Sequence, residues 1–381
     1  MRLHRASLVV AFFAMGVVGA TIPATIPGSA LRMHTDSDQL LQAISALFLG
    51  LFVGVVVVAV TRRHERRFLI TGLLLLFVGL AFLAASVTPM MFFVACALNG
   101  LGYGLVETSA TALTRSLAAR STSRHLAVLN GSSAVAAALS PLFIAAFPPL
   151  FQTIPVVLLC TVPLTGVVIA WVGVPCPKAT LSSTATGRRR MPIATLVVLG
   201  FAVFVFVGAE TVLSGWSSVL PQTVLGSPVE SAALGTSAFW VLAAAGRFIC
   251  AGLLRRGVSP ERYLVLVLLG AAAFAVSAAI VGHGPVAAIL VGAAIVSIAP
   301  VYALLLGRAL TRIDSGNSVP LVTGALVAAG AAGGVVISFF VALGAGSTPA
   351  AVFSWVGILL AVCLVLVLAE LPRRHRLIAG R

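Results

Sequence analysis

The chain alternates between long apolar runs and short polar gaps. A helix of about 20 apolar residues crosses the roughly 30 Å hydrocarbon layer of a bilayer. Twelve runs of that length occur in the 381 residues. The pattern predicts an all-α membrane protein with twelve transmembrane helices. These are expected at Ser7–Leu31, Leu40–Val60, Phe68–Val87, Met91–Leu113, Leu126–Phe147, Ile154–Val174, Ile193–Leu213, Ser231–Leu254, Tyr263–Val281, Pro285–Leu306, Val319–Leu343 and Ala350–Leu368.

Composition supports the membrane interpretation. Hydrophobic residues make up 60% of the chain, charged residues only 9%, and the mean hydropathy is +1.15, which excludes an ordinary soluble protein. The lipid bilayer is therefore an expected partner. The net charge of +15 does not indicate a nucleic-acid partner, because the Lys and Arg residues lie in short gaps between apolar runs instead of forming a folded basic face.

The positions of the positive charges predict the orientation. If the N-terminus is cytoplasmic, all Lys and Arg residues except Arg32 and Arg247 fall in cytoplasmic loops and tails. Cytoplasmic loops of membrane proteins are enriched in Lys and Arg. We therefore expect a multi-pass protein of the plasma (inner) membrane with both termini in the cytoplasm.

Two sequence repeats indicate that the chain arose by duplication. RRHERRFL follows helix 2 and RRGVSPERYL follows helix 8, 196 residues apart as judged by Glu65 and Glu261. ALTR ends helix 4 and occurs again at the end of helix 10, 197 residues later. An offset of six helices gives two halves with the same orientation, which is a parallel repeat. The expected units are a six-helix bundle at 1–174, a cytoplasmic linker at 175–190, and a second bundle at 191–381 that ends in a short basic cytoplasmic tail.

This organisation resembles the major facilitator superfamily of secondary transporters. Several stretches are similar to the fucose/proton symporter family and its relatives: GLGYGLVETSATAL in helix 4, LNGSSAVAAALSPL in helix 5, FVGAETVLSGW in helix 7, FWVLAAAGRF in helix 8 and IAPVYALLLG in helix 10. The resemblance implies the major facilitator fold and proton-coupled transport. Sugar symporters of this family carry an acid in helix 1, whereas GATIPATIPGSAL has none, so the solute stays open.

Two acidic residues inside predicted helices are the candidates for proton coupling, Glu107 in helix 4 and Glu210 in helix 7. A charged residue near the bilayer centre costs roughly 2.5–3.5 kcal/mol on insertion scales, so a retained acid usually faces a cavity or a partner. The resemblance adds that the position of Glu107 matches a functional acid of sugar symporters. The alternative is that each acid pairs with a basic residue or bonds a neighbouring helix.

Glu107 belongs to a row of polar residues spaced four apart, which comprises Asn99, Tyr103, Glu107, Thr111 and Arg115. Residues four apart lie on one helical face, so we expect this row to face a central cavity between the halves. Asn99 and Tyr103, together with Asn130, Trp216 and Tyr302, are the candidates for solute binding, although any of them could be an ordinary interhelical contact. Arg115 and Arg247 are candidates for gating or structural charges, and Arg247 could instead extend to the inner surface.

The remaining signals are structural. Gly100, Gly102 and Gly104 imitate a dinucleotide loop, but inside an apolar helix they predict close helix packing, as do the pairs Gly50/Gly54 and Gly330/Gly334. The five cysteines are scattered and no His lies at ligand spacing, so no metal and no cofactor is predicted.

The sequence therefore favours a secondary active transporter, not an enzyme, that works by alternating access. Its expected partners are a small polar solute and protons, and we expect a monomer. Proton-coupled symport is the preferred mechanism, and a proton-driven exporter of drugs or metabolites is the alternative. A membrane-embedded transferase would need clustered acids, His or metal ligands near one membrane face, whereas the six His residues fall in separate terminal or loop positions.

Overall fold

The computed structural model describes residues 2–36, 39–40, 42–61, 64–117, 121–174, 191–217, 220–226, 232–313, 318–345 and 348–370. All regular elements in these residues are helical, and twelve of the helical spans are long and apolar enough to cross a membrane. The first half contains α1 (Arg2–Met33), α3 (Ala43–Thr61), α4 (Glu65–Ala84), α5 (Pro89–Leu117), α6 (Thr122–Ala145), the 3-10 turn η1 (Pro149–Phe151), α7 (Thr153–Leu159) and α8 (Thr161–Gly173). The second half contains α9 (Ile193–Trp216), α10 (Leu220–Leu225), α11 (Ala232–Arg255), α12 (Pro260–Val281), α13 (Gly284–Ile298), α14 (Val301–Thr311), α15 (Ser318–Ala345) and α16 (Pro349–Glu370).

The twelve spans confirm the helices predicted from the apolar runs. Each structural span overlaps one predicted run, and the limits differ by five residues at most, at the end of helix 10. Helix 6 consists of α7 and α8, and helix 10 consists of α13 and α14. The predicted linker at 175–190 and the basic tail lie outside the described residues. The division into domains and the duplication stay predictions.

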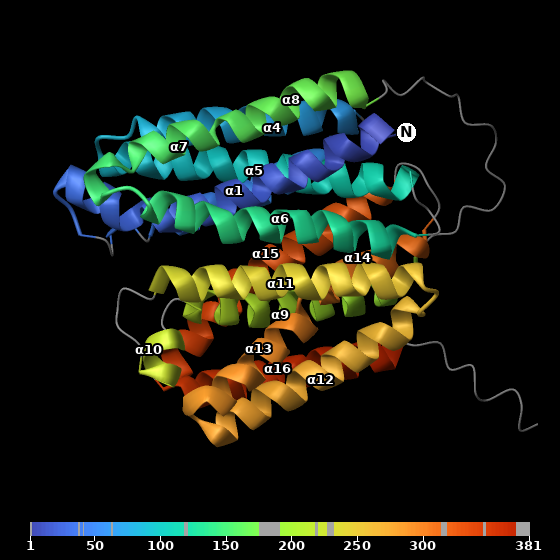
Figure 1. Ribbon diagram of the computed structural model, residues 1–381. Coiled ribbons are helices and arrows are strands. Elements are labelled where there is room, and N and C mark those ends of the chain that lie inside the picture. The colour runs from blue at the N-terminus through green and yellow to red at the C-terminus, as the bar shows by residue number, and fades with distance from the viewer. Residues whose placement is uncertain are drawn as a thin grey trace, which may run out of the picture.

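The helices form two bundles that lie side by side with their long axes roughly parallel (Figure 1). The first half contributes α1 to α8 and the second half contributes α9 to α16. Between the halves, α6 packs along α11, α3 packs along α15, and α14 contacts α6. These contacts between the halves thus involve α3 and α6 of the first half and α11, α14 and α15 of the second half.

Glycines bring neighbouring helices of the first half into backbone contact. A Cβ atom on Gly100 of α5 would lie 1.9 Å from the Leu47 carbonyl oxygen of α3, and one on Gly104 would lie 2.2 Å from that of Leu51. At the reciprocal positions on α3, a Cβ on Gly50 would lie 2.2 Å from the Ala97 carbonyl oxygen of α5, and one on Gly54 would lie 2.5 Å from that of Leu101. These distances are far below van der Waals contact, so only glycine fits. The predicted role of these residues in helix packing is confirmed.

Glycines also bring α15 close to α9 in the second half. Gly330 and Gly334 face Val207 and Thr211 of α9, and a Cβ on Gly333 would lie 1.9 Å from the Phe204 carbonyl oxygen. In the first half, Gly102 of α5, which lies between Gly100 and Gly104 in the sequence, approaches Gly72 of α4. These predictions of close packing are therefore confirmed as well.

The two halves meet tightly at one end of the molecule, where α1 begins and α16 ends. We call this end the base and define it by Arg115, Ser123, Gly307 and Arg312. An Arg115 guanidinium nitrogen donates to the Ile313 carbonyl oxygen of the other half over 2.9 Å. A Cβ on Gly307 would lie 2.0 Å from Ser123 Oγ. The base is closed in this structure.

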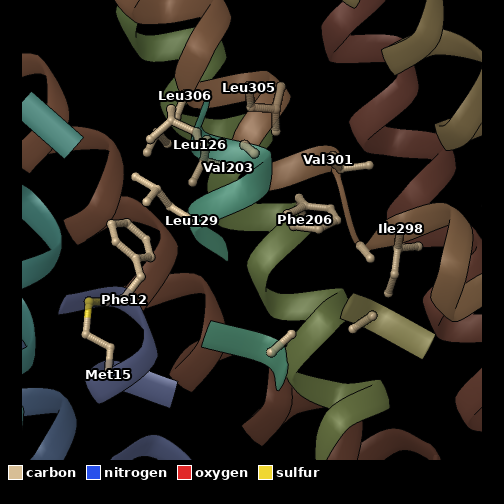
Figure 2. Packing of buried hydrophobic residues seen from close by; sticks show 14 of the residues in the cluster. Phe12, Met15, Leu126, Leu129, Val203, Phe206, Ile298, Val301, Leu305 and Leu306 are labelled. Carbon is tan, nitrogen blue, oxygen red and sulfur yellow. The ribbon is translucent and has the colours of Figure 1, made fainter. Parts of the chain in front are cut away.

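Apolar side chains from both halves form one continuous core. Figure 2 shows Leu126 and Leu129 of α6 beside Val203 of α9 and Leu306 of α14, with Phe12 and Met15 of α1 below them. Many large apolar side chains on the outer surface are exposed instead, Ile193, Ile280 and Leu49 among them. An apolar outer surface fits a protein that is surrounded by lipid.

Candidate functional site

Helix 10 is interrupted between Ile298 and Val301. Its first segment, α13, ends at Ile298, and α14 begins at Val301 after Pro300. Proline has no N–H group, so it cannot bond the carbonyl four residues earlier. That carbonyl belongs to Val296, and a Cβ on Gly246 of α11 would lie only 2.2 Å from its oxygen. The first bond of α14 is donated by Leu304 N to the Pro300 carbonyl over 3.1 Å, which places Ala299 outside both helical segments.

Arg247 occupies this break. Its Nε donates to the Ala299 carbonyl oxygen over 3.1 Å, and one Nη donates to the Glu210 carboxylate over 2.9 Å. The other Nη donates to the Asn130 carbonyl oxygen of the first half over 2.9 Å. The ring of Trp240 lies 6.0 Å from the guanidinium carbon. Each of the three nitrogens of the buried guanidinium therefore has an acceptor.

Arg247 thus joins its own helix, α11, to three other helices and links both halves of the protein. Only 5% of its surface is exposed, so it does not extend to the inner surface, which was one of the two predicted possibilities. Its ion pair with Glu210 matches the alternative considered for that acid, namely a basic partner. Buried charges are stable only when they are paired and hydrogen-bonded, and the pair meets both conditions.

Glu107 lies on the opposite side of the interface and bonds the second half. The Tyr302 hydroxyl of α14 donates to the Glu107 carboxylate of α5 over 2.6 Å. Glu107 is 8% exposed. Short O–H···O⁻ bonds of this kind are among the stronger hydrogen bonds of proteins. Unlike Glu210, Glu107 has no salt-bridge partner among the described residues.

Tyr103 lies beside these charged groups. It is within electrostatic range of Glu107, Glu210 and Arg247, and it packs against a small apolar cluster of Leu51 and Val55 of α3 with Val327 of α15. With both acids ionised and Arg247 protonated, the three charged groups carry a net charge of −1. One positive charge, a proton among the possibilities, would neutralise them.

Asn99 corrects the prediction of a single polar face on helix 4. Its side chain is fully buried against α4, where a Cβ on Gly79 would lie 2.7 Å from the Asn99 amide. The amide nitrogen donates to the Ala95 carbonyl of its own helix. The physical reason is that four residues exceed one helical turn, so each step rotates by about 40°. Asn99 therefore points into the first bundle while Glu107 reaches the second half.

The other predicted residues lie in different places. The Asn130 side chain donates to Leu126 of its own helix, and its backbone carbonyl, not its amide, contacts Arg247. Trp216 is half-buried in the last turn of α9. Arg115 lies at the base. Of the predicted solute-binding residues, the structure brings Tyr103 and Tyr302 together with Glu107.

Sequence reasoning missed two features of the site. The pairing of Glu210 with Arg247 joins residues 37 positions apart on different helices, and no spacing rule reveals it. The break in helix 10 had a visible signal, Pro300 in IAPVYALLLG, because proline interrupts the backbone bonds of a helix. Within the described ranges, no group of three or more His, Cys, Asp or Glu side chains could hold a metal ion.

Comparison with known proteins now assigns the family. The family model of the Major Facilitator Superfamily matches residues 6–319. The chain therefore belongs to the Major Facilitator Superfamily and is a multi-pass membrane transporter, not an enzyme. Its partners are accordingly a small-molecule solute and the lipid bilayer. A search of curated proteins finds no match.

Solved structures show the same fold. A superfamily transporter, FucP, in the outward conformation matches with a TM-score of 0.78 at 17% identity, covering 96% of this chain and 98% of that one. A substituted form of the Escherichia coli fucose:proton symporter FucP gives 0.76 at 17% identity over the same shares. The human organic anion transporter MFSD10 (TETRAN) gives 0.77 at 14% identity, again over 96% and 98%. The predicted resemblance to the superfamily and to the fucose symporter is confirmed at the level of the fold.

Proposed function

We propose that this protein couples the movement of a small polar solute to protons, with Glu107 as the proton carrier. The observation that carries the proposal is the bond between Glu107 of the first half and Tyr302 of the second half. A secondary transporter exposes its central site alternately to the two sides by movement of one half against the other. The hydrogen bond between this carboxylate and the opposite half should therefore form and break as the halves move.

The charge balance of the site supports the assignment. Arg247 already neutralises Glu210, which leaves Glu107 as the acid without an ionic partner among the described residues. A carboxylate in a membrane interior is costly when charged. Proton binding removes that charge. The protonated form of Glu107 therefore costs less free energy than the deprotonated form when the site is closed to water on both sides. Glu210 is the reserve candidate for coupling.

Symport is the mechanism that we propose first. The fucose:proton symporter has the same fold, and the second candidate is a proton-driven exporter of drugs or metabolites. The human organic anion transporter, which also has this fold, shows that the architecture carries unrelated solutes. We further propose that the protein is a monomer of the plasma (inner) membrane with both termini in the cytoplasm, as its positive charges predict.

The direction of coupling is tested in proteoliposomes that contain a pH-sensitive dye and start without a gradient. A solute is found first by its stabilisation of the purified protein against heat, because a cognate ligand stabilises the state that it binds. Addition of that solute outside should acidify the lumen if the protein is a symporter. Alkalinisation of the lumen would identify proton–solute exchange and favour the exporter.

The role of Glu107 is tested by the Glu107→Gln variant. Exchange of solute between equal pools should continue, whereas accumulation driven by a pH gradient should be lost, because only accumulation requires proton release. Glu65→Gln is the matched control, since Glu65 is a carboxylate in the first turn of α4 at the base. Glu210→Gln is measured beside them. Full gradient-driven accumulation by Glu107→Gln would contradict the proposed role.

A further inference from the structure

An apolar pocket lies in the second half at the end of the molecule opposite to the base. It is formed by the C-terminal end of α9, by α10, by the first half of α11 and by α13, and Figure 1 shows α10 at that end. Its volume is about 120 Å³. Ser217 is the only described lining residue with a polar side chain, and its hydroxyl already donates to the Ser214 carbonyl over 2.6 Å. The described lining therefore suits an apolar ligand and not a polar one.

Backbone contacts bound the pocket at both ends. Near the break in helix 10, α11 and α13 touch, because a Cβ on Gly246 would lie 2.2 Å from the Val296 carbonyl oxygen. At the other end α11 touches the end of α9, because a Cβ on Gly235 would lie 2.3 Å from the Ser217 carbonyl oxygen. Between these contacts α11 and α13 diverge and leave the pocket. It is closed along the direction of the helices, so its opening lies to the side.

The opening faces lipid, not the central site. Leu234, Ala238 and Val241 are exposed on α11, and their spacing of four and three residues places them on one face of the helix. Ala238 also lines the pocket. Arg247 follows Ala238 by nine residues, which at 3.6 residues per turn corresponds to about 180° around the helix. The pocket and the central site therefore lie on different sides of α11.

The other walls of the pocket also begin at the lipid-facing surface. On α13, the lining residue Ala288 adjoins Ile289, whose side chain is exposed. On α10, the lining residue Leu225 is itself exposed. Deeper in the pocket, Phe239 of α11 and Ile295 of α13 are buried, and we call these two residues the floor. The pocket is thus a recess that leads from the lipid-facing surface into the core.

We propose that this pocket holds one acyl chain of a membrane lipid. Apolar cavities of about 150 Å³ stay free of water and bind apolar molecules such as benzene. The bilayer is a partner of this protein, and its hydrocarbon adjoins the exposed apolar rim of the pocket, so a ligand of the right chemistry is always present at the opening. A chain in the pocket packs between α11 and α13 where these helices do not contact each other, and its dispersion contacts stabilise their separation.

The test uses a phosphatidylcholine that carries a photoreactive diazirine near the end of one acyl chain. The full chain is reconstituted into phosphatidylcholine vesicles that contain this lipid, irradiated, digested and analysed by mass spectrometry. Ile289 is exposed to lipid, so its labelling is the internal standard. The floor residues are buried, so their labelling requires a chain inside the pocket. We expect labels on Ile289 and on both floor residues.

Two variants fill the pocket from α13, namely Gly292→Leu and Ala288→Leu. A Cβ on Gly292 would lie 3.5 Å from the Leu242 side chain, which is ordinary van der Waals contact, so the new side chain enters the pocket without displacing a helix. Each variant should lose the labels on the floor and keep the label on Ile289. Gly252→Leu is the matched control, because it adds the same side chain to an exposed position of α11 with no atom within 4 Å. It should be labelled as the parent is.

Two results would overturn the proposal. An unlabelled floor in the parent protein would show that the pocket excludes lipid, as it would if a second copy of the chain or the solute filled it. A floor that is labelled equally in the parent and in both filled variants would show that the labels reach it by another route. Labelling is measured without solute and without a pH gradient, so neither result depends on the proposed proton coupling.

Discussion

Replacement of Gly307 by alanine should open the base of the transporter. The added Cβ would lie 2.0 Å from Ser123 Oγ and 2.7 Å from Ser123 Cα. Rotation of the hydroxyl relieves the first contact but not the second, because Cα belongs to the backbone of α6. Normal carbon–carbon contacts are about 3.5–4.0 Å, so α14 and α6 must separate by roughly 1 Å while the base stays closed.

The magnitude follows from the cost of overpacking. Extra atoms in a well-packed region cost about 1–3 kcal/mol. This cost applies only while Gly307 and Ser123 are in contact, so it disfavours the closed base relative to a state in which the halves have separated there. A difference of 1–3 kcal/mol changes the ratio of two populations by about 5–150-fold. The ratio of open to closed base should rise by a factor in this range.

Spin labels report the opening when they are attached to Cys residues that replace Arg67 of the first half and Arg255 of the second half. Both residues are exposed at the base, and pulsed electron resonance gives the distribution of distances between them. Cys96, Cys160, Cys250 and Cys363 are buried, and Cys176 is replaced by Ser in all samples. The population with a long distance should increase in Gly307→Ala.

Two other glycines serve as controls. Gly200→Ala adds a Cβ with no atom within 4 Å and should leave both the distances and the stability unchanged. Gly100→Ala places a Cβ 1.9 Å from the Leu47 carbonyl oxygen, but both residues belong to the first half. It should therefore lower the thermal stability without changing the distance between the halves. An unchanged distance distribution in folded Gly307→Ala protein would refute the reasoning.

Two further predictions concern the ion pair and the topology. Arg247→Met leaves Glu210 as an unpaired buried acid and should lower the stability by about 3–5 kcal/mol. The Arg247→Met/Glu210→Gln double variant should recover most of that loss, as measured by thermal unfolding in one detergent. A double variant no more stable than the single one would argue against the pairing. A Cys placed at Ser183, in a Cys176→Ser background, should escape a reagent that cannot cross the membrane of intact cells, because the linker is predicted to be cytoplasmic; its modification would reverse the orientation.

The helices could be predicted from the sequence because lipid imposes a simple requirement. Every span needs about 20 apolar residues to cross the hydrocarbon layer. It must also be helical, so that its backbone N–H and C=O groups bond one another where no water is present. The close approach of Gly100 and Gly104 to α3 was predictable for a similar reason, since small residues at intervals of four permit backbone contact. These features depend on local composition, and twelve such segments leave few alternatives.

The site was predictable only in part because it depends on partners far apart in the chain. Glu107 stood out as an acid in an apolar run, yet its bond to Tyr302 spans 195 positions. Asn99 shows the limit of the spacing argument. The rotation of about 40° per step accumulates, so residues eight positions apart on helix 4 contact different neighbours. One partner of Arg247, the Ala299 carbonyl, lies at the break beside Pro300. The sequence shows the proline but does not show that Arg247 bonds the carbonyl next to it.

The interruption of helix 10 has a mechanical consequence for the second half. Because no continuous ladder of backbone bonds connects α13 to α14, the two segments can tilt about residues 299–300 independently of each other. The α14 segment contacts α6 of the first half as well as α9, α12 and α15 of its own half, whereas α13 contacts α10, α11 and α12 of its own half. Helix 4, the predicted counterpart, is continuous from Pro89 to Leu117. Helix 10 is therefore more easily bent than helix 4, and we expect α14 to tilt relative to α13 as the base separates.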